Sequence, residues 1–355
     1  MRKYNKGEWS EIYAFTYLLA SGVLYAADEN ANRLDEVFFP VIKIIREEEP
    51  GRPIDYKTGE TIRIYDGDRL LKEVARSDFE QITEELFDKI VDGERAFEIP
   101  SVDEFFDNIY CTKVKAASNK KQDITIQLHD VNTGITPVCG FSIKSYIGAN
   151  PTLINPGKNT NFTFSINGCT DEIMEEINAI ETRNKLIDKM DNLVRHRCSF
   201  VPQDNSISEQ FYENLQFVDS RMPMLLSYAL LYCYQYGIKN CNEIIEKMKE
   251  LNPLSFSNPE MYPYKFKKLL CAWALGLTPE RDDWLGKEDA NGGYIIVKKD
   301  GEVVCYHLYN RSEFENYLFN HTCFDSPSTS RYEYMSVYKE NDEYKIKLCL
   351  QVRSK

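Results

Sequence analysis

Two short runs of alternating polar and apolar residues, 123–129 and 140–144, hold side chains well suited to chemistry. Successive side chains of a β-strand point to opposite faces, so each run has one apolar and one polar face. The residues between the runs favour turns, and the pattern predicts an antiparallel β-hairpin. On its polar face we expect the pairing to bring Lys144 close to Asp123.

A carboxylate and an ammonium group that converge over a hydrophobic layer can support metal-dependent hydrolysis of a phosphodiester. The carboxylate can hold Mg²⁺, which polarises the phosphate and lowers the pKa of a bound water. The lysine can position the attacking water or offset the developing negative charge. An ordinary surface hairpin shows the same alternation, so the pattern alone leaves both interpretations open.

Asp123, the strand that follows it and the run Ser142-Ile143-Lys144 resemble the catalytic core of PD-(D/E)xK nucleases. Gln122 stands where that motif has proline, and Ser142 stands where it has the second acid. The resemblance therefore implies that Asp123 holds the metal and that Lys144 orients the attacking water, with one carboxylate ligand still to be found.

The wider sequence is similar to the HpaII group of type II restriction endonucleases. The similarity runs from residue 5 to about residue 200 and rests on residues 5–11, 140–145, 151–155 and 160–162. It implies sequence-specific, Mg²⁺-dependent cleavage of double-stranded DNA at CCGG, within a restriction-modification system whose methyltransferase protects host DNA. Two alternatives stay open: a structure-selective DNA repair or junction nuclease, and a catalytically inactive DNA-binding relative.

The missing acid is expected on the first helix, which should begin near Gly7 and end near Gly22. Its Lys-Gly-x-x-x-Glu opening resembles the first helix of several PD-(D/E)xK enzymes, and this selects Glu11 as the second metal ligand. The alternative is that Glu8 and Glu11 only favour the helix dipole. Gln127, on the polar face of the hairpin, would orient water or phosphate.

The charge distribution gives a second indication of a nucleic-acid partner. The formal net charge of −13 repels phosphate at long range. Between residues 111 and 170, however, the sequence contains six lysines and only two acidic residues, Asp123 and Asp130. These lysines are Lys113, Lys115, Lys120, Lys121, Lys144 and Lys158. They predict either a phosphate-binding cleft or a solvated lysine-rich loop.

The loop 148–161 is rich in amides, hydroxyls and turn-forming residues, so it can approach a DNA backbone closely. Its candidates for DNA contact are Thr152, Asn155, Lys158 and Asn161. Farther on, Arg195 and Arg197 form a basic cluster that could read guanine edges in the major groove. The alternative for this pair is a complement to a helix dipole.

The chain is long enough for one or two domains, and its patterns predict an α/β (α+β) fold. We expect a PD-(D/E)xK-like core with the first helix over residues 1–170. A helical segment should follow over 171–290, and a C-terminal segment of antiparallel strands with one helix over 291–355.

The ten cysteines are irregularly spaced and form no Cys-x-x-Cys pair, which argues against a zinc site. They predict buried, reduced thiols of a prokaryotic cytoplasm. The apolar residues 12–27 mimic a secretory signal but are better interpreted as a helix, and no stretch reaches membrane-spanning length. A palindromic target would suit a homodimer, and a monomer that nicks each strand in turn is the alternative.

Overall fold

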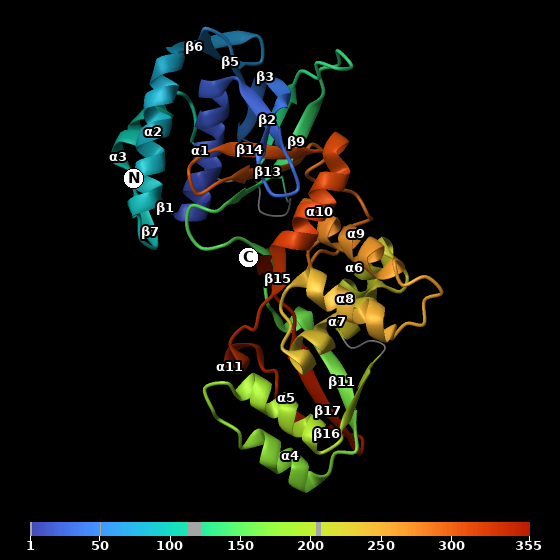
Figure 1. Cartoon of the computed structure of the whole chain (residues 1–355). Coiled ribbons are helices and arrows are strands. Elements are labelled where there is room, and N and C mark those ends of the chain that lie inside the picture. Colours follow the sequence, from blue (N-terminus) through green and yellow to red (C-terminus); the bar gives the residue numbers. More distant parts are fainter. Residues whose placement is uncertain (1, 50, 113–121, 204–206) are drawn as a thin grey trace. The chain divides into compact units, whose positions relative to one another are not determined.

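The fold of the computed structural model is mixed α/β, as predicted, and it is described for residues 2–49, 51–112, 122–203 and 207–355 (Figure 1). The chain forms two compact units. Unit 1 comprises Met1–Pro151, Ala274–Gly276 and Glu288–Tyr317, and unit 2 comprises Thr152–Trp273, Leu277–Lys287 and Leu318–Lys355. The predicted boundaries at residues 170 and 290 differ from this division, because unit 1 also includes the later segments Ala274–Gly276 and Glu288–Tyr317.

A nine-stranded sheet forms the centre of unit 1, in the order β2-β14-β13-β9-β8-β3-β4-β5-β6. Its strands are β2 (Val23–Ala27), β3 (Arg33–Glu49), β4 (Arg52–Lys57), β5 (Thr61–Asp66), β6 (Arg69–Ala75), β8 (Ile124–Leu128), β9 (Val138–Ser145), β13 (Gly293–Val297) and β14 (Val303–His307). The first half of the long strand β3 also pairs with β2. Strand β2, which stands first in the order above, is therefore hydrogen-bonded both to β14 and to β3.

The expectation of a separate C-terminal β segment fails at β13 and β14. Strand β13 pairs with β14 in antiparallel fashion, but on its other side it runs parallel to β9, where Tyr294 lies opposite Ser142. All residues of β13 are buried, which is typical of a strand covered on both faces. The predicted β8–β9 hairpin is therefore an interior part of a larger sheet.

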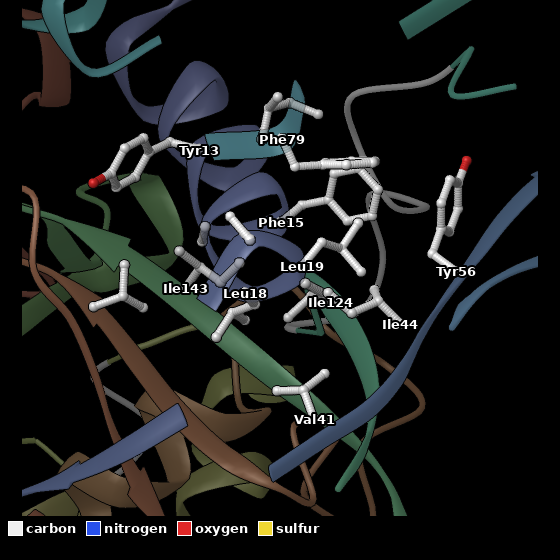
Figure 2. Close-up of a cluster of buried hydrophobic side chains, with 14 of the residues drawn as sticks. Tyr13, Phe15, Leu18, Leu19, Val41, Ile44, Tyr56, Phe79, Ile124 and Ile143 are labelled. Carbon is white, nitrogen blue, oxygen red and sulfur yellow. The ribbon is translucent and has the colours of Figure 1, made fainter. Parts of the chain in front are cut away.

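Helix α1 (Lys6–Ser21) covers the apolar face of β8 and β9. It begins with a capping box made by Asn5 and Glu8 and ends at Gly22, whose φ of 70° suits glycine. Figure 2 shows Phe15, Leu18 and Leu19 of this helix among the strand residues Ile44, Ile124 and Ile143. Phe15 and Leu18 are fully buried, and each such side chain contributes about 1.5–3 kcal/mol by leaving water.

Helices α2 (Arg76–Asp92) and α3 (Pro100–Asn108) complete the layer that contains α1, and the short strands β1 (Lys3–Asn5) and β7 (Ala96–Glu98) pair beside them. Helix α2 buries Phe79, Leu86 and Ile90 at helical spacing. The indole nitrogen of Trp9 donates to the carbonyl of Phe97 at 3.1 Å. These contacts hold the start of α1 in place.

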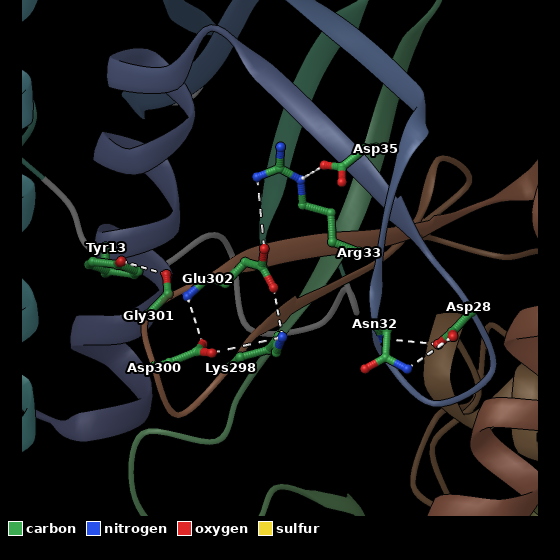
Figure 3. Close-up of polar contacts among 9 residues, drawn as sticks. All are labelled: Tyr13, Asp28, Asn32, Arg33, Asp35, Lys298, Asp300, Gly301 and Glu302. Atoms are coloured by element: carbon green, nitrogen blue, oxygen red, sulfur yellow. Dashed lines mark hydrogen bonds and ion pairs between the residues drawn. The ribbon is translucent and has the colours of Figure 1, made fainter.

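The turn between β13 and β14 is tied to α1 and to β3 by polar contacts (Figure 3). The buried hydroxyl of Tyr13 donates to the carbonyl of Gly301 at 2.6 Å. The Glu302 carboxylate forms an ion pair with Lys298 at 2.6 Å and lies 3.8 Å from the guanidinium of Arg33. A side chain at position 301 would meet the Tyr13 hydroxyl at 2.8 Å, so only glycine fits this close approach.

Unit 2 combines two smaller antiparallel sheets with helices. The four-stranded sheet has the order β12-β11-β17-β16, and the three-stranded sheet has the order β10-β18-β15. Their strands are β10 (Thr152–Ile154), β11 (Asn161–Asn167), β12 (Ser199–Pro202), β15 (Thr322–Phe324), β16 (Val337–Glu340), β17 (Glu343–Cys349) and β18 (Val352–Ser354). Strand β12 interrupts the stretch that was expected to be helical.

Helices α4 to α9 confirm the predicted helical character of most of residues 171–275. They are α4 (Asp171–Asn178), α5 (Lys185–Arg195), α6 (Glu209–Val218), α7 (Met222–Tyr236), α8 (Cys241–Leu251) and α9 (Met261–Leu275). Helix α10 (Arg311–His321) and the short α11 (Thr329–Tyr332) follow later in the chain. Most residues of α7 are buried, as its nearly uniform apolar sequence predicts.

All ten cysteines are free thiols, as predicted, and eight of them are buried. Within the described ranges, no helix is long and apolar enough to cross a membrane.

Candidate active site

Asp123 lies immediately before β8 and is held by the neighbouring strand. Its backbone N–H donates to the carbonyl of Phe141 at 2.9 Å, which continues the β8–β9 ladder by one step. Its carboxylate oxygen Oδ2 accepts a hydrogen bond from the backbone N–H of Ile143 at 2.6 Å and lies 3.2 Å from the donating hydroxyl of Ser142. The carboxylate is therefore oriented by β9 before any ligand binds.

The pairing register differs from the expected one. Ile124 lies opposite Phe141, so Asp123 faces Ser142 and not Lys144. Lys144 lies two residues farther along β9 and, by the alternation of the strand, on the same face as Ser142. Such diagonal neighbours across a strand pair are about 7–8 Å apart. Lys144 is partly buried, and its ammonium remains within reach of groups near Asp123.

Ser142 takes the place of the second acid and has a clear local role. It is fully buried, and its hydroxyl donates to the Asp123 carboxylate. A buried hydroxyl needs such a partner, because leaving it unpaired costs about 1–3 kcal/mol. A carboxylate at this position would instead face Asp123 as a like charge. The serine therefore leaves Asp123 without a second carboxylate opposite it.

Tyr294 is a neighbour of this site that the sequence did not indicate. It lies opposite Ser142 on β13 and is buried. Burial, the nearby Tyr146 phenol and the charge of Asp123 raise the pKa of Tyr294 well above its usual value, so its phenol stays protonated. It is the one hydroxyl in the apolar strand Gly293–Val297, and this was the only signal that could have indicated it.

Glu8 and Glu11 differ in their local surroundings. The Glu8 carboxylate accepts the backbone N–H of Asn5 at 3.0 Å and completes the capping box of α1. Glu11 lies one turn farther along the helix, and both glutamates are partly buried. Because α1 packs on the apolar face of β9, Ser142 and Lys144 point away from the helix.

The beginning of α1 nevertheless lies near the end of β9. A side chain on Gly148 would meet the Lys6 side chain at 3.1 Å, so the segment that follows β9 passes close to the start of the helix. This end of the hairpin also holds Asp123 and Lys144. Glu11 could therefore join the site only past the end of β9, not through the sheet.

Gln127 is positioned away from the other candidates. It lies four residues from Asp123 on the extended strand β8, which corresponds to about 13 Å. Its side-chain amide donates to the carbonyl of Thr136 at 3.1 Å, at the turn end of the hairpin. The structure therefore does not bring Gln127 beside Asp123, and its role in orienting water or phosphate stays a prediction.

Within the described part of the chain, no three histidine, cysteine or acidic side chains cluster as a metal site would require. A Mg²⁺ ion keeps several waters and can be held by one or two carboxylates. Asp123 offers the oxygen chemistry that Mg²⁺ prefers, in an orientation set by β9, so the residues present fit this ion.

The candidates for DNA contact in the loop after residue 151 all belong to unit 2. Thr152 is on β10, where it pairs with Arg353, and Asn155 is exposed. The Lys158 side chain is 72 % exposed and lies 3.2 Å from Glu333. Thr152, Asn155 and Lys158 therefore stay predictions.

Asn161 was also expected to contact DNA, and its surroundings hold it within unit 2. Its side chain is only 9 % exposed. Its amide nitrogen donates to the carbonyl of Tyr332 at 2.8 Å, within unit 2. A side chain that is buried and bound in this way supports the fold, and a DNA contact by Asn161 stays a prediction.

Arg195 and Arg197, at the end of α5, are exposed. Between them His196 lies 3.1 Å from Glu176, and Arg197 has a φ of 59°. Their place at a helix C-terminus suits the helix dipole as well as a DNA contact. Of the six lysines in the predicted basic approach, Lys113, Lys115, Lys120 and Lys121 lie outside the described residues.

Comparison with known proteins gives a consistent result. The family model of the HpaII restriction endonuclease matches residues 5–354. The chain is 38 % identical over 360 residues to the type II restriction enzyme HpaII of Haemophilus parainfluenzae, and the alignment covers 98 % of each chain. No solved structure matches. The chain therefore belongs to the HpaII restriction endonuclease family and is a type II site-specific deoxyribonuclease.

Proposed function

We propose that this enzyme hydrolyses double-stranded DNA at CCGG in a Mg²⁺-dependent reaction centred on Asp123 and Lys144. The observation that carries the proposal is the arrangement of the β8–β9 hairpin. It orients the Asp123 carboxylate through Ile143 and Ser142 and places Lys144 diagonally on the same face. The predicted PD-(D/E)xK core has the same two residue types on neighbouring antiparallel strands.

Asp123 would hold the metal ion, and Glu11 would be the second carboxylate. Glu8 is the weaker candidate because its carboxylate already completes the capping box of α1. When bound, Mg²⁺ supplies Lewis-acid polarisation of the phosphate and lowers the pKa of a coordinated water. Lys144 would orient the attacking water and offset the negative charge that develops on the phosphate.

Ser142 would act through Asp123, and Tyr294 is its neighbour on β13. The serine hydroxyl holds one carboxylate oxygen, and the protonated phenol of Tyr294 lies on the same side of the sheet. Ser142 would be a positioning residue, because it acts through its hydrogen bond to Asp123. It would keep the carboxylate in one orientation while DNA and metal bind.

The recognition site and the partner rest on family membership. The HpaII family suggests CCGG as the target, and a DNA methyltransferase of the same specificity would protect the host genome. A palindromic target would suit a twofold dimer in which each protomer cuts one strand.

Digestion of an unmethylated plasmid in Mg²⁺, followed by sequencing of the fragment ends, tests this function. We expect every end to lie in a CCGG sequence and no cleavage in EDTA. A different fixed motif would contradict the target but retain the activity. Ends without any fixed motif would favour a structure-selective nuclease, and intact plasmid would favour an inactive DNA-binding relative.

A matched substrate tests the partner. The same plasmid, methylated beforehand at the cytosines of CCGG, should resist digestion because a methyl group occupies the major-groove edge of the target. Equal cleavage of both substrates would contradict protection by a methyltransferase of this specificity.

A further inference from the structure

Unit 2 contains a pocket of about 490 Å³ that none of the predicted DNA contacts lines. It lies between the start of α5, the end of α7 and the segment 326–330. Sites for small organic ligands usually measure about 300–1,000 Å³. The pocket is therefore large enough for one nucleotide.

The charge of this pocket is opposite to that of the protein as a whole. Three basic side chains line it, Arg183, Lys185 and Lys239, and among the described residues no acidic one belongs to its lining. The chain carries a formal net charge of −13. Concentrating three cations in one concave site of an acidic protein favours an anionic ligand.

The ion pairs of these cations leave positive charge available. Lys185 lies 2.9 Å from Glu181, whose side chain is 69 % exposed, and water screens such a pair strongly. Lys239 lies 3.6 Å from Asp325, which also accepts Arg353 at 2.9 Å. One carboxylate therefore faces two cations and neutralises only one.

Hydroxyl groups and apolar side chains complete the pocket. Ser326, Ser328 and Ser330 lie on one side, and the hydroxyls of Ser328 and Ser330 are 3.2 Å apart. Hydroxyls donate hydrogen bonds to phosphate oxygens, and a hydroxyl can rotate towards its acceptor, whereas the donors of arginine have a fixed geometry. Tyr234 belongs to the lining and is 7 % exposed, with its hydroxyl fixed on the carbonyl of Cys349 at 3.0 Å.

We propose that this pocket binds one nucleotide, with its phosphate at Arg183, Lys185 and Lys239 and its sugar or base against the apolar side near Tyr234. The ligand is either a nucleotide of the DNA substrate or a free nucleoside monophosphate, because both present the same groups. The first source rests on the proposed cleavage of duplex DNA and would make the pocket an additional contact to the substrate. The second would make it a separate ligand site.

A pair of double variants tests the pocket. Arg183→Gln with Lys185→Gln removes two cations from it; Arg183 is exposed and Lys185 is partly buried. The matched control is Lys247→Gln with Lys249→Gln on α8, which removes two partly buried lysines that also pair with glutamates, at 2.8 and 3.3 Å. Both variants change the net charge equally within unit 2.

The first measurement is the affinity for a short target duplex in EDTA, where no cleavage occurs, at several salt concentrations. If the ligand is part of the DNA, the pocket variant should bind at least about tenfold more weakly. The slope of its affinity against salt concentration, on logarithmic axes, should become shallower by about 0.9 for each phosphate that it no longer neutralises. The control should stay within about twofold of the wild type, because its lysines lie outside the pocket.

The second measurement is the binding of dCMP and of inorganic phosphate to the full chain by calorimetry. If the ligand is a free nucleotide, dCMP should bind the wild type and the control but not the pocket variant, while duplex affinity stays unchanged. Weaker binding in either measurement, confined to the pocket variant, supports the site. Unchanged results in both, or equally weakened binding by the control, would overturn it.

Cleavage in Mg²⁺ separates this inference from the proposed function. The pocket variant should still cut DNA at saturating substrate, because Asp123 and Lys144 are intact. If the wild type cuts normally and the pocket variant binds duplex and dCMP as the wild type does, only the proposed nucleotide site is contradicted. A wild type that does not cut would contradict the proposed function, and the dCMP measurement would still test the pocket.

Discussion

The two faces of the β8–β9 hairpin have opposite properties. One face holds Ile124, Ile126 and Ile143, which are at most 5 % exposed and belong to the same core cluster as the buried residues of α1. The other face holds Asp123, Ser142 and Lys144, where the structure places hydrogen bonds and charge. Since a slip of one residue would turn each face over, the apolar face determines which polar residues meet.

This difference separates stability from chemistry within one strand pair. Substitutions on the apolar face should lower the free energy of unfolding and leave the remaining folded molecules active. Substitutions on the polar face should reduce cleavage while the fold and DNA binding persist. A change that fails to separate these properties would break the comparison.

Replacement of Lys144 should have a large effect on the cleavage rate. Lys144→Ala should lower the cleavage rate by about 10²–10⁴-fold, the usual contribution of a group that acts on the transferred proton or the attacking water. Duplex affinity in EDTA should change little, because the lysine acts on the nucleophile. Single-turnover cleavage and fluorescence anisotropy measure the two quantities.

Lys43→Ala is the matched control for Lys144→Ala, since Lys43 is a partly buried lysine of the same sheet that pairs with Asp55. It should cut at nearly the wild-type rate. Near-wild-type cleavage by Lys144→Ala would exclude the polar face of the hairpin as the reactive face.

Replacement of Ile126 should affect stability instead. This side chain is fully buried, and truncating such a residue to alanine costs about 2–5 kcal/mol of folding free energy. Thermal unfolding of Ile126→Ala should therefore occur at a clearly lower temperature than that of Thr125→Ala, its neighbour on the opposite face. Equal destabilisation by both substitutions would show that the two faces do not differ in their contribution to stability.

Replacement of Glu11 tests the second metal ligand. Glu11→Gln should shift the Mg²⁺ concentration for half-maximal cleavage upward by at least about tenfold and should lower the rate, because changes around a bound metal commonly cost 10–100-fold in metal affinity. Glu8→Gln should leave the Mg²⁺ dependence unchanged and should mainly weaken the capping of α1.

Equal and mild effects of both glutamate substitutions would mean that neither residue holds the metal. A strong shift with Glu8→Gln alone would place the ligand one turn earlier on the same helix.

Replacement of Ser142 should have the smallest effect on the polar face. Ser142→Ala removes one of the two hydrogen bonds to Asp123 Oδ2 and leaves the backbone N–H of Ile143 in place. Cleavage should fall by about tenfold, which corresponds to a single hydrogen bond to a charged group. An unchanged Mg²⁺ dependence together with an unchanged rate would show that the serine does not position the carboxylate.

The sequence predicted the hairpin and its two faces but not its register. Alternation is a local property, and the buried positions Ile124, Ile126 and Phe141 follow it. The register depends on the turn, where the backbone N–H of Asp130 donates to the carbonyl of Ile135 at 2.9 Å. This closes the turn one residue earlier than expected, so the partner of Asp123 shifts by two residues.

The parts that the sequence did not indicate depend on contacts between distant segments. The parallel pairing of β13 with β9 joins residues about 150 positions apart, and it brings Tyr294 to the site. The pocket of unit 2 likewise combines three separate segments. No local periodicity encodes such contacts, which follow from the packing of the whole chain.

Metal-dependent cleavage by Asp123→Asn tests the central claim most directly, because the substitution keeps the size of the side chain and removes only its charge. A Mg²⁺ titration of plasmid cleavage should show a rate lowered by about 10³-fold or more at every concentration, since a bound metal ion supplies several kcal/mol to such a reaction. Duplex affinity in EDTA and thermal stability should stay close to those of the wild type. A variant that cuts at a near-wild-type rate with an unchanged Mg²⁺ requirement would contradict the assignment of the reactive face.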